Sequence, residues 1–500
     1  MSALYPFRGD ISLHVKGRIA EEDALRQERT AREILERLMT QPGVILADEV
    51  GMGKTFVALA VAVSVALTNR GKRPVVVMVP SSLKEKWPAD FALFREKCLP
   101  DEVRQRVQDA QAERAIDFLK LLDDPPERRK SVIFLTHGAM SRGLNDQWVM
   151  LALIWQSLYR RRNTDSLRNA LYRVLGELLQ MKWAENCGED LWERLLAKHP
   201  SQWLKVVQDV VEIEDDPVPE AVWRVLPELN TNSVYDALYR IPFRHSKNFA
   251  DYVLAARHVI KNEIRELWKE CLGKLHLRLP LLVLDEAHHL KNADTRLASL
   301  FRSGEAQEDA DEIARGPFGG VFERMLFLTA TPFQLGHGEL CSVLDRFDGV
   351  AWNGVNAPSC GREGFEKQRE DLRAALDAAQ EAAVTLDHAW GRLRSDDLQI
   401  TGRAFEDVEQ WWAEASDGVG LTTAAADVVH CFSRAKERMG VAEQGLRPWV
   451  IRHLKPRQLP GSDSAIPRRK RLIGSSICPG TGDEEQAGLA VSGEALLPFL

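Results

Sequence analysis

Five short apolar runs recur along the chain, and each is bounded by turn or helix signals. They occupy residues 44–47, 75–79, 132–135, 281–284 and 325–328. Continuous apolar runs of this length are typical of parallel strands that are buried on both faces of a sheet. Segments with helical spacing lie between them, such as residues 55–67. The alternation predicts an α/β domain with a parallel, doubly wound sheet, in which ligands bind at the carboxyl ends of the strands.

A long segment, residues 141–279, interrupts this alternation. A structureless loop of that length is uncommon in a compact domain, so we expect an inserted helical subdomain. Its apolar residues follow helical spacing: Leu167, Leu171, Val174, Leu175, Leu178, Trp203, Val206, Val207 and Val210. Residues 215–219, rich in Asp and Pro, predict a joint inside it. The sheet domain is therefore discontinuous, with residues 1–140 and 280–355 on either side of the insertion.

Residues 356–455 form a second helical segment. Within residues 364–393, apolar positions alternate in steps of four and three, as in a coiled-coil seam. They are Leu372, Leu376, Ala379, Ala383, Leu386, Trp390 and Leu393. The pattern favours a long helix packed on a neighbour, and a coil dedicated to a protein partner is the alternative. Residues 456–500, rich in Pro, Gly, Ser and basic residues, are typical of a linker.

Composition narrows the class of protein. A length of 500 residues predicts more than one domain, and a net charge of −7 gives no global basic surface, so any contact with nucleic acid must be local. Single cysteines without a C-x-x-C pair exclude a zinc or disulfide framework and fit the reducing cytoplasm. They are Cys98, Cys187, Cys271, Cys341, Cys360, Cys431 and Cys478. The N-terminus lacks a signal pattern, and the longest apolar run, residues 56–67, is too short for a membrane span of about 20 residues.

A phosphate-binding loop follows the first predicted strand and opens a helix. Gly51 and Gly53 would let backbone N–H groups curl around phosphate oxygens, and the positive end of the helix dipole would add to the attraction. Lys54 would reach the β- and γ-phosphates of ATP, and the Thr55 hydroxyl would ligate Mg²⁺. Glu49 and Met52 complete the loop. Asp48 stands where the strict phosphate-loop pattern has its first glycine.

Two acids end the fourth predicted strand. Asp285 would hold Mg²⁺ through water, and Glu286 would polarise the attacking water as general base, with His288 in the same box. The next strand ends in Thr329-Ala330-Thr331-Pro332, where the hydroxyls of Thr329 and Thr331 could bond to these carboxylates and sense the γ-phosphate. An ordinary strand end is the alternative for each pair taken alone.

The order and spacing of these boxes resemble the first RecA-like domain of superfamily-two helicases with a DEAH box, and particularly the Swi/Snf-type translocases. Residues 47–55 are similar to the phosphate loop of that group, which also tolerates Asp at the first position. Residues 328–336 resemble the third motif of the bacterial RNA-polymerase-associated member. Residues 446–455 look like the connector into the second RecA-like domain. The resemblance implies ATP hydrolysis with Mg²⁺ and a nucleic-acid partner, most simply double-stranded DNA.

The resemblance also implies roles for residues outside the boxes. Gln27 matches the glutamine that reads adenine, although a surface glutamine is the alternative. Pro80, Ser81 and Trp87 look like a segment that touches the nucleic-acid backbone. Thr136 and His137 fall where a second backbone contact is expected. The basic runs 160–162 and 468–471 could contact phosphates or be solvated.

Three functions stay open from the sequence. The first is the ATP-binding half of a helicase-like ATPase, slow as this chain alone because the second domain, with its arginine finger worth about 10³–10⁵ in rate, would begin where the sequence ends. The second is an ATP-dependent switch, or a motor completed by a partner, with a protein bound to the helical insertion. The third, disfavoured by the acid box, is an ATPase without nucleic acid.

Overall fold

The computed structural model describes residues 5–453 apart from several stretches. Those stretches are residues 18, 50, 70–72, 140–145, 160, 182–188, 209, 211–212, 214, 243–247, 275–277, 291–317, 330–336 and 416–417. The predicted linker, residues 456–500, and the basic run 468–471 lie outside the described residues.

In the described part of the chain, seven strands form one parallel sheet in the order β3-β4-β2-β5-β6-β1-β9. All five predicted strands are confirmed, as β1 (Gly43–Leu46), β2 (Val75–Val79), β4 (Val132–Thr136), β5 (Leu282–Leu284) and β6 (Met325–Leu328). The apolar pattern does not predict the two edge strands, β3 (Asp109–Ala112) and β9 (Val450–Ile451). An edge strand is covered less completely than a central one, so its sequence need not be a continuous apolar run.

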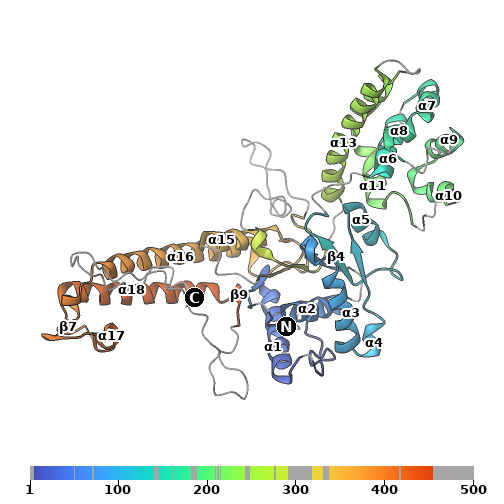
Figure 1. Cartoon of the computed structure of the whole chain (residues 1–500). Helices are drawn as coiled ribbons and strands as arrows, with labels where there is room; N and C mark the ends of the chain where they lie inside the picture. Colours follow the sequence, from blue (N-terminus) through green and yellow to red (C-terminus); the bar gives the residue numbers. More distant parts are fainter. Residues whose placement is uncertain are drawn as a thin grey trace.

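Alternate strand residues point to opposite faces, so the sheet has a core on each side. Val44, Leu46 and Val77 pack on the face covered by α1 (Glu21–Thr40), α2 (Lys54–Thr68), α3 (Lys86–Cys98) and the short α4 (Asp101–Arg104). Ile45 and Val76 pack on the other face, which carries α5 (Ala115–Asp123) and α15 (His337–Leu344) (Figure 1). Residues 57–67 of α2 are all buried, which confirms a buried helix there.

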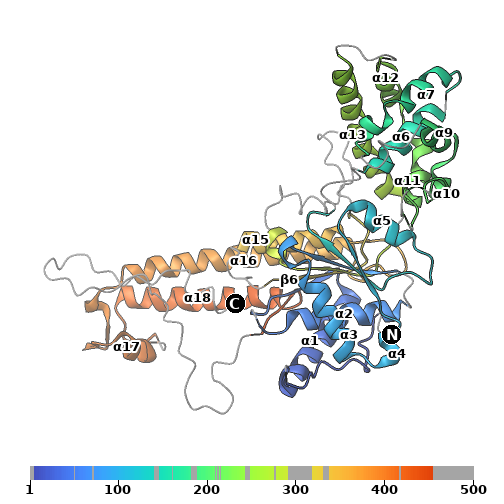
Figure 2. The ribbon, with the colours of Figure 1, turned by 45° about the vertical axis from the view of Figure 1, so that its right-hand side comes forward.

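The described residues from 146 to 274 contain helices and no strand, and they stand beyond α5 in both views (Figure 2). These helices are α6 (Gln147–Tyr159), α7 (Asp165–Tyr172), α8 (Leu175–Leu179), α9 (Glu189–Ala197), α10 (Leu204–Val207), α11 (Glu220–Val225), α12 (Asn232–Tyr239) and α13 (Phe249–Lys274). The predicted apolar positions are buried except Val210, which is 46% exposed just after α10.

The second helical segment is a long antiparallel pair. α16 (Gly361–Gly391) lies beside α18 (Thr423–Leu446), and its predicted seam residues Leu372, Leu376 and Leu386 are buried (Figure 2). α17 (Val408–Ala415) and the two-stranded ribbon of β7 (Gln399–Ile400) and β8 (Arg403–Ala404) cover the far end. The predicted fold class, an α/β phosphate-loop domain with a helical insertion and a C-terminal helical segment, is confirmed. The exact domain boundaries stay a prediction.

No helix in the described part of the chain combines the length and the apolar character needed to cross a bilayer.

Candidate ATP site

The phosphate loop lies between β1 and α2, as the sequence predicts. Gly51 and Gly53 have φ of 87° and 85°, in the left-handed region that favours glycine. A Cβ on Gly53 would also lie 2.2 Å from Gln27 Nε2, so a side chain at this position would displace the Gln27 amide. α2 begins at Lys54, and its first backbone N–H groups have no partner within the helix. The loop thus has the left-handed glycines and the helix N-terminus that a phosphate group requires.

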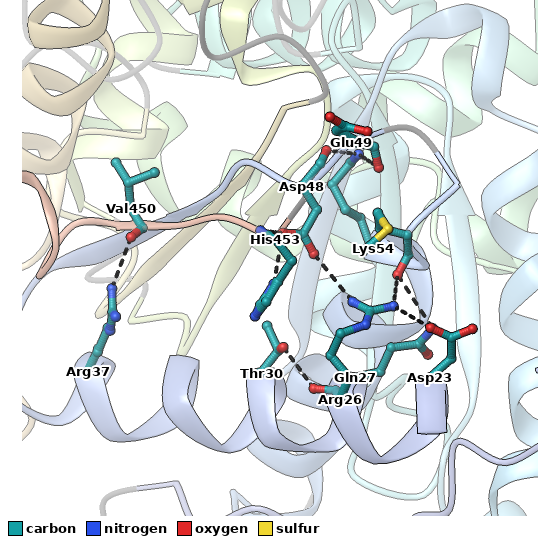
Figure 3. Close-up of polar contacts among 11 residues, drawn as sticks. Asp23, Arg26, Gln27, Thr30, Arg37, Asp48, Glu49, Lys54, Val450 and His453 are labelled. Carbon is teal, nitrogen blue, oxygen red and sulfur yellow. Dashed lines mark hydrogen bonds and ion pairs between the residues drawn. The ribbon is translucent and has the colours of Figure 1, made fainter. Parts of the chain in front are cut away.

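The Lys54 side chain folds back over the loop in this structure. Its Nζ donates to the carbonyl of Asp48 over 2.5 Å and to that of Glu49 over 3.1 Å (Figure 3). Thr55, in the first turn of α2, is half-buried. An ammonium, a hydroxyl and a helix N-terminus at one strand end form the donor set expected for a nucleoside triphosphate with Mg²⁺.

Gln27 lies against this loop rather than on the surface. Its side chain is 4% exposed, and its Nε2 donates to the Met52 carbonyl over 3.5 Å. Its Oε1 is buried and accepts no hydrogen bond from the described residues. The solvated-surface alternative for Gln27 is therefore wrong. The predicted adenine contact stays a prediction that this free acceptor supports, since a buried acceptor ordinarily has a partner.

The acid box lies at the carboxyl end of β5. Asp285 Oδ1 accepts from the backbone N–H of Glu286 over 2.9 Å, and the Glu286 carboxylate lies 3.1 Å from His288 Nδ1. Glu286 has φ of 52°, which is uncommon for a residue with a side chain and is a strained conformation of the kind found at functional sites. The short helix η5 (Ala287–Leu290) follows directly. The turn at Asp285 and Glu286 and the contacts of their carboxylates therefore fix where these two side chains lie.

Trp87 corrects one sequence expectation. The side chain is 2% exposed, so its ring is not offered to a nucleic acid in this structure. Its indole Nε1 instead donates to Asp285 Oδ2 over 2.8 Å. Together with Glu286 N–H on Oδ1, it binds both oxygens of this carboxylate. The spacing after β2 places Trp87 on α3, beneath the strand ends, and gives no sign of which way the ring turns.

The other residues predicted to contact nucleic acid lie at the same edge of the sheet. Pro80 follows β2, and Ser81 is exposed at the start of the short helix η1 (Ser81–Leu83). Thr136 ends β4, and the His137 ring lies 6.1 Å from that of His289 in the acid box. Burial and the neighbouring His289 lower the pKa of His137 to about 4, so this ring is neutral at pH 7.

Thr329 lies between the two boxes. It directly follows β6, which pairs with β1 on one side and β5 on the other. Its side chain is buried, and its backbone N–H donates to the Leu46 carbonyl over 3.1 Å. Thr331 lies outside the described residues. The strand order thus places Thr329 between the phosphate-loop strand and the acid-box strand, where a coupling residue is expected.

Two residues of the site have no signal in the sequence. Arg26, one position before Gln27, donates to the Met52 carbonyl over 3.1 Å. His453, in the segment after β9, binds Asp48 at the start of the loop. A separation of 405 residues along the chain hides this pairing from any local pattern.

Comparison with known families decides the relationship. The SNF2-related domain family matches residues 26–114, which include Gln27, the phosphate loop and Trp87. Residues 26–114 are therefore similar to an SNF2-related domain. The predicted resemblance to the Swi/Snf-type, helicase-like ATPases of superfamily two is thereby confirmed.

Curated relatives agree with this assignment. The chain is 28% identical over 219 residues to the RNA polymerase-associated protein RapA of Pseudomonas putida (strain GB-1), over 40% of this chain and 21% of that protein. It is 27% identical over 232 residues to RapA of Pseudomonas fluorescens (strain SBW25), over 43% of this chain and 23% of the relative. The chain therefore spans about a fifth of the length of these relatives.

A solved structure is also similar. The Sulfolobus solfataricus SWI2/SNF2 ATPase core in complex with dsDNA aligns over 88% of this chain and 60% of that chain, at 13% identity and a TM-score of 0.29.

Proposed function

We propose that this SNF2-related domain binds ATP·Mg²⁺ and hydrolyses it to ADP and phosphate in a nucleic-acid-dependent cycle. The observation that carries the proposal is one of placement. The phosphate loop after β1 and the acid box after β5 end at the same edge of the sheet, with only β6 between them. Both halves of a phosphoryl-transfer site therefore face the same space.

Each side chain has a defined task in this proposal. Lys54 would move from the loop carbonyls to the β- and γ-phosphates, Thr55 and Asp285 would hold Mg²⁺, and Gln27 would read adenine. Glu286 accepts the proton of the attacking water, and His288 orients its carboxylate from 3.1 Å. Bound Mg²⁺ neutralises charge that develops on the phosphate oxygens. Glu49, Gly51, Met52 and Gly53 provide the loop backbone.

The nucleic-acid surface is proposed at the same edge. Pro80, exposed Ser81, Thr136 and His137 follow β2 and β4, the strands next to β5. The contact of the His137 ring with His289 would couple nucleic-acid binding at this surface to the acid box. Double-stranded DNA is the partner we propose, with the inserted helices α6–α13 free to contact a protein partner such as an RNA polymerase. A cytoplasmic location accords with the scattered cysteines.

The test is the rate of ATP hydrolysis at saturating Mg²⁺ with duplex DNA, single-stranded DNA, RNA or no nucleic acid. We expect duplex DNA to raise the rate and added salt to reduce the effect, because phosphate contacts release counterions. Glu286→Gln should keep ATP binding and lose hydrolysis. A wild-type chain that binds ATP but shows the same rate with every nucleic acid would contradict the nucleic-acid part of the proposal.

A further inference from the structure

The carboxylate of Asp48 is buried where a strict phosphate loop has its first glycine. The residue is 0% exposed, and a buried carboxylate is stable only where hydrogen bonds or a charge compensate it. One residue supplies two of these bonds. The backbone N–H of His453 donates to Asp48 Oδ1 over 2.6 Å, and the His453 Nδ1 lies 3.0 Å from the same oxygen (Figure 3). Because a carboxylate only accepts, the imidazole proton is on Nδ1.

His453 belongs to residues 446–455, the predicted connector. The connector is paired with the strand that carries the loop, since Ile45 N–H donates to the Trp449 carbonyl and Ala47 N–H to the Ile451 carbonyl, each over 2.8 Å. β9 therefore runs parallel to β1, and both strands end at the same place. His453 meets Asp48 at that end.

Arg26 links the same carboxylate to the middle of the loop. Its guanidinium lies 4.0 Å from Asp48 Oδ2 and donates to the Met52 carbonyl over 3.1 Å (Figure 3). Lys54 Nζ donates to the Asp48 carbonyl, so the residue is held through both its side chain and its backbone. When Lys54 turns toward phosphate it must release or lengthen that bond. Binding of a phosphate group by Lys54 therefore also changes the contacts of Asp48.

We propose that His453 is a positioning residue for the phosphate loop, and that its contact with Asp48 couples nucleotide occupancy to the connector. The proposal rests on ATP binding at this loop. His453 holds the first loop residue in place from outside the set of sequence boxes. The connector, in turn, is held more or less firmly according to whether Lys54 binds the loop or a phosphate. Neither Asp48 nor His453 contacts the nucleotide through its side chain, and both act through the loop.

The test measures ADP affinity with Mg²⁺ and the amide hydrogen exchange of residues 449–453, with and without ADP. The full chain is used as wild type, His453→Ala and His453→Asn. The His453 side chain is 31% exposed, so its truncation should leave the fold intact. We expect ADP to change the exchange rate at 449–453 in the wild type, because Lys54 then leaves the Asp48 carbonyl. His453→Ala should weaken ADP binding about tenfold, the loss typical of positioning partners, and abolish the ADP effect on exchange. His453→Asn, which keeps a side-chain N–H, should restore part of both.

Arg37→Ala is the matched control. Arg37 holds the same segment by donating to the carbonyls of Arg447 and Pro448. It also donates to the Val450 carbonyl, and it has no hydrogen bond to the described loop residues (Figure 3). It should speed exchange in β9 and leave ADP affinity unchanged. The proposal is overturned if His453→Ala keeps wild-type affinity and the ADP effect, or if Arg37→Ala weakens ADP binding equally. A wild type that does not bind ADP would instead refute the proposed function.

Discussion

Trp87 Nε1 donates a hydrogen bond to Asp285 Oδ2 over 2.8 Å, from a ring that is almost completely buried beneath the strand ends. Asp285 N–H donates to the Met78 carbonyl and Glu286 N–H to Asp285 Oδ1. The orientation of the carboxylate is therefore fixed before a metal ion arrives. Partners that orient a metal ligand are usually as important to activity as some of the ligands themselves.

Trp87→Phe keeps the buried ring and removes the donor. We expect it to lower kcat and raise the Mg²⁺ concentration required for half-maximal activity by about tenfold each, because Asp285 is free to rotate. Trp352→Phe is the matched control, since its Nε1 donates over the same 2.8 Å to the Asp348 carbonyl, outside the ATP site. Equal Mg²⁺ dependence in wild type and Trp87→Phe would show that Asp285 needs no such support.

Lys54→Ala and Glu286→Gln separate binding from chemistry. Lys54→Ala removes the only side-chain cation within the loop and should abolish measurable ATP binding. Glu286→Gln keeps the shape of the acid box and should lower the hydrolysis rate by about 10²–10⁴-fold, the usual contribution of a general base, at unchanged ATP affinity. A Glu286→Gln variant that retains full biological function would favour an ATP-dependent switch over a motor.

Gly53→Ala tests the fit between the loop and Gln27. The new Cβ would meet Gln27 Nε2 at 2.2 Å and would need a left-handed backbone, which costs about 1–2 kcal/mol for a residue with a side chain. We expect ATP affinity to fall by at least about tenfold. Gly402→Ala carries a similar backbone strain at φ of 82° with nothing within 4 Å, so it should lower stability slightly and leave ATP affinity unchanged.

His137 predicts a pH dependence of stability. Its pKa is about 4 in the folded chain, below the ordinary value of 6.5, so the unfolded chain takes up a proton that the folded chain does not. The free energy of unfolding therefore does not depend on this ring above pH 6.5 and decreases as the pH falls toward 4. The decrease is at most about 3 kcal/mol, because solvent screens a ring that is partly exposed. Chemical denaturation without Mg²⁺ or nucleotide should show a steeper loss for wild type than for His137→Gln. Parallel profiles would contradict this.

The sequence predicts the central strands because strands buried on both faces require continuous apolar runs such as residues 75–79. β3 and β9 escape prediction because an edge strand can be as polar as Asp109–Ala112 or as short as Val450–Ile451. The boxes that contain Lys54 and Asp285 are short continuous segments, and the sequence therefore predicts them. The contacts of Trp87 with Asp285 and of Asp48 with His453 join residues 198 and 405 positions apart, and only the folded sheet brings them together.

The contacts of Asp48 explain why this residue can replace the first glycine of the phosphate loop. The residue departs from the strict phosphate-loop pattern, and the sequence offers only a family resemblance as the reason. In the structure its side chain lies against His453 and Arg26 (Figure 3). The place of the first glycine is therefore used to anchor the loop.

The most direct test of the central claim is a titration of wild type and Lys54→Ala with ATP in the presence of Mg²⁺, followed by calorimetry. The account predicts one site per wild-type chain, a loss of affinity when Mg²⁺ is removed, and no detectable binding to Lys54→Ala. Equal binding to both proteins, or none to a folded wild type, would contradict it.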